Sequence, residues 1–259
     1  MFWKDVKRSV FSLGMLLSLV IGILLLIEPV FPLWRHWLTG SGDRENVLNY
    51  FFTALALGGY LIFTPLLTVL PGILSFCEEW NTGYIKYILA RRRPGRYIVC
   101  RMVSNGVVSG LATTLPLAAF MFLSIPVLTS YTASDMAVGR MSPFHETIFR
   151  PLELIWGGWG CVLAVLGSAF VFGIVWGTLA LGISACFPNR YVSLCAPFML
   201  FFSLHIGVNA VGLWQYSPMN TLLPDVLPSF AFLGVYQLVL LTVGALLCVC
   251  AMRRRLRHV

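Results

Sequence analysis

The chain has 259 residues, of which 58% are hydrophobic and only 11% are charged, and its mean hydropathy is +0.84. A soluble domain carries about 25% charged residues, so this composition excludes an ordinary soluble fold and indicates an integral membrane protein. The apolar stretches reach the length of about 20 residues that a membrane-spanning helix needs, whereas the sequence lacks the short alternating segments of a membrane barrel. The predicted class is therefore an all-α membrane protein, with residues 1–259 forming a single domain.

The first predicted elements are a short N-terminal segment and the first membrane span. In residues 1–10, Phe2 and Val6 lie on one helical side and Lys4 and Lys7 lie elsewhere. This pattern fits a helix in the membrane interface and fits a simple basic anchor equally well. The apolar run over 11–28 is longer than the core of a secretory signal and has no small-residue cleavage site, so we expect a retained span.

Five further apolar runs complete a prediction of six spans, which cover residues 48–74, 102–129, 155–185, 191–213 and 229–251. Prolines inside these runs would kink the helices, which is tolerated where neighbouring helices satisfy the freed carbonyl groups. Residues 214–228 are too polar and too rich in proline to cross the bilayer. We expect them to form an outer or re-entrant segment, with a plain outer loop as the alternative.

The basic residues predict the orientation, because loops rich in lysine and arginine stay in the cytoplasm. If both termini are cytoplasmic, fourteen of the 18 basic residues face the cytoplasm, and the outer loops carry Arg35, Arg44, Arg140 and Arg150. Topology and attraction to anionic membrane lipids then account for the net charge of +8. No nucleic-acid partner is expected.

The stretch "CEEWNTGYIKYILARRRPGRYIVCR", residues 77–101, lies between the second and third predicted spans. Glu78 and Glu79 suit the start of a helix and Arg91 suits its end, because this order of charges matches the helix dipole. We therefore predict a helix over 78–93 that stops at Pro94, with an aromatic stripe that includes Tyr84 and Tyr87. A cytoplasmic loop that binds nothing is the alternative, since any inner loop is rich in arginine.

This stretch resembles the cytoplasmic segment between the second and third spans of ABC-2 type transporter permeases. The matching positions are Glu79, Gly83, Leu89, Pro94, Arg96 and Arg101. Tyr84 departs from the threonine that is more usual in that family, and the step from Pro94 to Arg96 is one residue shorter than usual. The interfacial N-terminal helix, six spans with both ends inside, and helices between the last two spans agree with the same family.

The resemblance implies the permease subunit of an ATP-driven exporter in a bacterial plasma membrane. In that family the interhelical segment is the coupling helix that contacts the ATPase, which here implies Glu78, Glu79, Gly83, Tyr84, Tyr87 and Arg91. The chain has no GxxxxGK[ST] phosphate loop, so ATP and magnesium would be bound by a separate ATPase chain. A second permease copy or a sibling permease would complete the transporter.

Polar and small residues inside the spans suggest further contacts. His205 and Asn209 are four residues apart on one helical face and could line a substrate path or bond to neighbouring helices. Two GxxxG patterns, Gly106 to Gly110 and Gly173 to Gly177, could pack within one chain or between two chains. Cys248 and Cys250 have no neighbouring ligand cluster, so neither a metal site nor another cofactor is expected.

The near absence of charge in the middle of the spans argues against an ion-coupled carrier and favours an amphiphilic or hydrophobic cargo, such as a drug, a peptide of the bacteriocin kind or a lipid-linked molecule. The four histidines are dispersed and the aspartates do not cluster, so we do not expect an enzyme. Two alternatives stay open: the substrate-capture subunit of an ATP-driven importer, and a membrane assembly subunit that transports nothing.

Overall fold

A computed structural model describes residues 2–32, 35, 47–89, 94–125, 148, 150–223 and 229–256. These residues form helices and connecting turns, with no strand among them. In chain order the helices are α1 (Phe2–Val10), α2 (Leu13–Ile27), η1 (Glu28–Val30), α4 (Val47–Leu57), α5 (Tyr60–Val69), α6 (Ile73–Asn81), α7 (Tyr84–Leu89), α8 (Pro94–Ser124), α10 (Arg150–Cys186), α11 (Arg190–Ala210), η2 (Trp214–Tyr216), η3 (Pro218–Thr221) and α12 (Phe230–Leu256).

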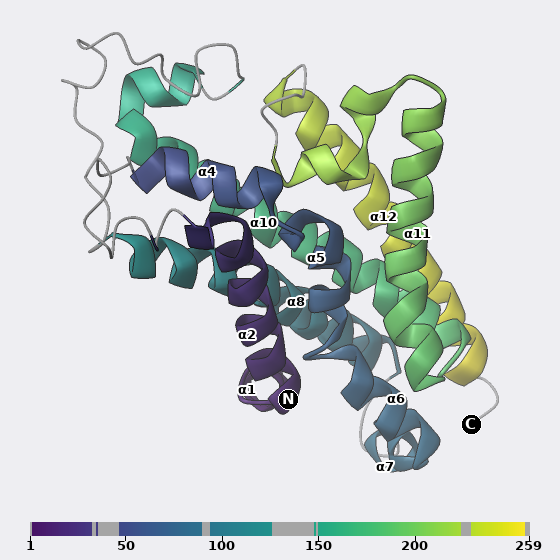
Figure 1. The fold of residues 1–259 in the computed structure, drawn as a ribbon. Helices are drawn as coiled ribbons and strands as arrows, with labels where there is room; N and C mark the ends of the chain where they lie inside the picture. Colours follow the sequence, from purple (N-terminus) through teal and green to yellow (C-terminus); the bar gives the residue numbers. More distant parts are fainter. Residues whose placement is uncertain are drawn as a thin grey trace, which may run out of the picture.

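Within these residues, five helices are long and apolar enough to cross a membrane, namely α2 with η1, α8, α10, α11 and α12. A sixth span exists if α4 and α5 are taken together, although they meet at an angle of 76°. The prediction of a multi-pass helical membrane protein is thereby confirmed. In Figure 1, α8 and α10 lie in the middle of the bundle and the other long helices surround them.

The predicted second span, 48–74, is not one straight helix. It breaks at Gly58 and Gly59, and α4 lies across one end of the bundle while α5 runs along it (Figure 1). A Cβ atom on Gly58 would lie 2.5 Å from the carbonyl oxygen of Ala54 and 2.8 Å from that of Leu25. The absence of a side chain therefore lets α2 approach the break closely.

The third span begins earlier than predicted. The sequence suggested that Pro94 stops a helix, but Pro94 is the first residue of α8. Proline suits the first helical position, because its missing N–H has no intrahelical acceptor there and its fixed φ is already helical. Part of the expected 102–129 and 214–228 segments, together with Arg91, lies outside the described residues.

The glycines of the two GxxxG patterns pack against each other inside the chain, between α8 and α10. A Cβ atom on Gly173 would lie 2.5 Å from the Ser109 carbonyl oxygen and 2.7 Å from the Cα of Gly110. The Thr113 hydroxyl donates to the Ala169 carbonyl at 2.7 Å, and the Asn105 amide nitrogen donates to the Gly177 carbonyl at 2.8 Å. Close backbone packing and interhelical hydrogen bonds thus stabilise the centre of the bundle, where the hydrophobic effect does not drive helices together because the lipid tails are apolar as well.

Candidate functional site

The candidate site is the segment formed by α6 and α7, between the spans α5 and α8. The expected single helix over 78–93 is in fact two helices with a turn at Thr82 and Gly83, and its residues 90–93 lie outside the described part of the chain. Gly83 has a φ of +71°, a left-handed conformation that favours glycine. Its N–H donates to the Trp80 carbonyl and that of Thr82 to the Glu78 carbonyl, which closes the end of α6.

The two glutamates consequently lie in the last turns of α6 and not at the start of a helix. The expectation about the helix dipole was therefore wrong, because a carboxylate near a helix C-terminus faces the negative end of the dipole. Arg8, Arg101 and Arg190, from other elements, compensate through ion pairs, and a fourth arginine, Arg255, lies over the ring of the neighbouring Trp80. We call Glu78, Glu79 and Trp80, together with these four arginines, the α6 junction.

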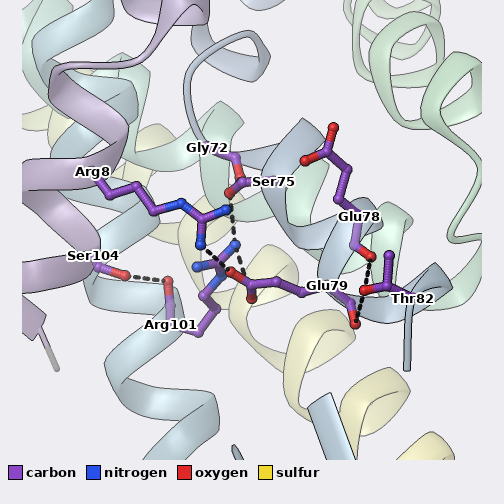
Figure 2. Close-up of polar contacts among 8 residues, drawn as sticks. All are labelled: Arg8, Gly72, Ser75, Glu78, Glu79, Thr82, Arg101 and Ser104. Atoms are coloured by element: carbon purple, nitrogen blue, oxygen red, sulfur yellow. Dashed lines mark hydrogen bonds and ion pairs between the residues drawn. The ribbon is translucent and has the colours of Figure 1, made fainter. Parts of the chain in front are cut away.

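Glu79 is the buried centre of the α6 junction, with 8% of its surface exposed. Its carboxylate lies 3.3 Å from a guanidinium nitrogen of Arg8 and 3.6 Å from one of Arg101 (Figure 2). Arg101 is itself 6% exposed and also donates to the Ser75 hydroxyl at 2.9 Å. Burial raises the pKa of Glu79 above its usual range, and the Arg101 and Arg8 guanidiniums oppose that shift.

Two further contacts join the α6 junction to the second half of the chain. Glu78 forms a half-exposed ion pair with Arg190, at 3.4 Å, at the start of α11. The guanidinium of Arg255, in the last turn of α12, lies 5.4 Å from the centroid of the Trp80 ring and donates to the carbonyl of Cys186 at the end of α10. Short α6 therefore contacts α1, α8, α11 and α12 through charged side chains.

The two tyrosines of α7 are exposed, unlike the buried Glu79 of the α6 junction. Tyr84 is 54% exposed and Tyr87 is 73% exposed, and their ring centroids lie 6.4 Å apart. The predicted coupling residues thus divide into two kinds. Glu78 and Glu79 bind other helices of this chain, whereas Tyr84 and Tyr87 offer an aromatic surface that the described residues do not cover.

His205 and Asn209 lie far from the α6 junction along the chain, near the other end of α11. A ring nitrogen of His205 lies 2.6 Å from the Ser217 hydroxyl oxygen, and the Asn209 amide nitrogen lies 3.1 Å from the other ring nitrogen. Ser217 in turn accepts a hydrogen bond from the Met219 N–H and caps η3. These bonds attach η3 to α11 and favour the structural interpretation of the pair; a role in a substrate path stays a prediction.

The sequence did not reveal the arginine partners of the two glutamates. One signal was present: Arg8, Arg101, Arg190 and Arg255 each border an apolar run at the end predicted to be cytoplasmic, as does Glu79. Opposite charges at the same level of a bundle attract, but the sequence alone did not say which helices are neighbours. In the described residues no group of three or more His, Cys, Asp or Glu side chains is placed to hold a metal ion.

These observations define a multi-pass α-helical membrane protein whose N-terminal helix and last helix meet at one short interhelical segment. No family model matches the chain, and no curated protein matches it either. The resemblance to ABC-2 type permeases accordingly depends on the residues between the second and third spans and on the order of the spans.

Proposed function

We propose that the chain is the membrane permease subunit of an ATP-driven exporter of the ABC-2 type, in the plasma membrane of a bacterium. ATP and magnesium are bound by a separate ATPase subunit, and a second permease copy or a sibling permease forms the other half. The observation that carries the proposal is the α6–α7 segment, in which an exposed tyrosine surface is joined to an α6 helix that contacts four other elements.

This arrangement suits the transmission of movement. A partner that binds Tyr84 and Tyr87 displaces α7, and the turn at Gly83 connects α7 directly to α6. The contacts of Glu79 and Glu78 then pass the displacement to α1, α8 and α11. Nucleotide-driven closure of an ATPase pair would rock these helices as rigid bodies, which is how many transporters open alternately to the two membrane faces.

The cargo in this proposal is amphiphilic or hydrophobic. In α8 no charged residue follows Arg101, and in α10 none follows Glu153, so the middle of both central helices is uncharged. A charged cargo or a coupling ion would need a partner charge there, because an unpaired charge in the bilayer is costly. Drugs, apolar peptides and lipid-linked molecules satisfy this condition.

Photocrosslinking in native membranes tests the proposed contact with an ATPase. A benzoylphenylalanine replaces Tyr87, and matched controls replace Tyr191, which is exposed at the start of α11, and Trp214, which is exposed beyond the other end of α11. We expect Tyr87 to give an adduct with a soluble chain that carries a phosphate loop, at a yield that changes with ATP and vanadate. Trp214 gives none. An ATPase adduct at Trp214, or none at Tyr87, would refute the proposal.

A further inference from the structure

A groove lies between the last turns of α10 and α12, at the end of the bundle that carries the α6 junction. Its volume is about 660 Å³, which falls within the range of about 300–1,000 Å³ that is typical of ligand pockets. Its walls include Cys186, Phe187, Leu247, Cys250, Arg254 and Arg255. The proposed ATPase contact at Tyr84 and Tyr87 and the hydrogen bonds of His205 do not involve this groove, so the groove needs a separate functional explanation.

The α12 wall of the groove changes from apolar to basic along the helix axis. Leu247, Cys250 and Arg254 follow each other at spacings of three and four residues, so they lie on one face of α12. Seven residues of helix correspond to roughly 10 Å along the axis. The groove therefore offers an apolar wall next to the membrane interior and a positive charge at its mouth.

The two arginines of the groove are not equivalent. Arg255 is held in place, since it donates to the Cys186 carbonyl and stacks on Trp80. Arg254 is exposed, and within the described part of the chain no carboxylate forms an ion pair with Arg254 or Arg255. The mouth of the groove thus carries positive charge that the described residues leave uncompensated, which favours a negatively charged ligand.

We infer that this groove binds one anionic phospholipid of the surrounding leaflet, with the phosphate at Arg254 and an acyl chain along Leu247. An anionic lipid matches both ends of the groove. A soluble phosphate would leave the apolar wall empty, and a zwitterionic lipid such as phosphatidylcholine would bring a positive head-group charge next to the two arginines. Basic pockets between helices at the membrane surface are suited to such head groups. This inference needs only that the chain lies in a membrane, so it does not depend on the proposed function.

Lipid retention by the full-length purified protein tests the inference. The protein is mixed in detergent with equal amounts of phosphatidylglycerol and phosphatidylcholine, and native mass spectrometry counts the lipids that stay bound. The test variant is Arg254→Gln, and the matched control is Arg253→Gln, which removes the same charge from a neighbouring exposed residue that does not line the groove. A third variant, Cys250→Trp, fills the groove without changing the charge.

We expect wild type and Arg253→Gln to retain one phosphatidylglycerol, and Arg254→Gln to retain about five-fold less, since one basic residue near the surface is worth about 1 kcal/mol. Cys250→Trp should also lose the lipid. Equal losses in both arginine variants would mean diffuse attraction and would overturn the inference, as would equal retention of phosphatidylcholine. Release by glycerol phosphate would indicate a soluble anion. Unchanged lipid binding in Cys250→Trp, together with dissociation of a dimer, would indicate that a second copy covers the groove.

Discussion

The packing of α8 against α10 gives the sharpest prediction, through the substitution Gly173→Ala. The new methyl carbon would lie 2.5 Å from the Ser109 carbonyl oxygen and 2.7 Å from the Gly110 Cα, both of them backbone atoms that no rotamer change can move. Relief therefore requires the two helices to separate by about 1 Å, given that such contacts normally lie beyond about 3.4 Å. The cross-helix bond from Thr113 to Ala169, now 2.7 Å, would lengthen as well.

The magnitude follows from three contributions. Overpacking a tight contact costs about 1–3 kcal/mol, and weakening an interhelical hydrogen bond adds about 0.6 kcal/mol. Alanine recovers up to about 1 kcal/mol through its better helix propensity. We expect a net loss of about 2 kcal/mol in the free energy of unfolding, which corresponds to a decrease of roughly 4–8 °C in Tm for a chain of this size.

The matched control is Gly167→Ala, six residues earlier in α10, where a Cβ atom would meet nothing within 4 Å. It makes the same chemical change in the same helix and should leave Tm unchanged or raise it. Thermal unfolding in detergent is followed with a maleimide dye in a Cys195→Ser, Cys250→Ser background, which lacks the two exposed thiols, so that the dye reports exposure of the buried thiols of Cys77, Cys161 and Cys248. Equal Tm values for the two variants would refute the claim that α8 and α10 are in backbone contact at Gly173.

Two more pairs of substitutions, each a test variant with its control, examine the candidate site with the same assay. Glu79→Lys places a third positive charge beside Arg8 and Arg101, so we expect the free energy of unfolding to fall by at least about 3 kcal/mol. Glu78→Lys changes the half-exposed ion pair with Arg190 and should cost about 1 kcal/mol or less. Similar losses in the two variants would contradict the burial of Glu79. Gly83→Ala should cost about 1–2 kcal/mol because its φ is positive, while Gly95→Ala, which has open space and no positive φ, should be neutral; a neutral Gly83→Ala would argue against the turn between α6 and α7.

The apolar runs predicted a multi-pass helical membrane protein because membrane insertion depends on local hydrophobicity, which a sequence displays directly. Of the six predicted spans, five are long apolar helices in the described residues, and the sixth is the bent pair of α4 and α5. The break between α4 and α5 was not predictable in this way. The break lies where the Leu25 carbonyl approaches Gly58, a tertiary contact between residues far apart in the chain. The sequence also did not predict that Pro94 begins α8, since a proline is compatible both with the end of one helix and with the first position of the next.

The candidate site, like the fold, was predictable from the sequence only in part. The sequence placed Glu79, Gly83 and the tyrosines in one interhelical segment, as the structure does. It did not show that Glu79 is buried against Arg8 and Arg101 while Tyr87 is exposed, because helical periodicity says which residues share a face and not what lies opposite that face. Glu79 is therefore not a surface residue that a partner could contact directly, whereas Glu78 is half-exposed.

The contacts of the α6 junction become possible one after another as the chain is synthesised. A ribosome completes α6 long before Arg101, Arg190 and Arg255 have been made, so Glu79 has only Arg8 available as a partner when it first emerges. Of the later helices, α8, α11 and α12 each add one arginine contact, and the stacking of Arg255 on Trp80 comes last. This end of the bundle therefore has its full set of contacts only once α12 has been made, and a chain that ends before α12 leaves the ring of Trp80 without Arg255.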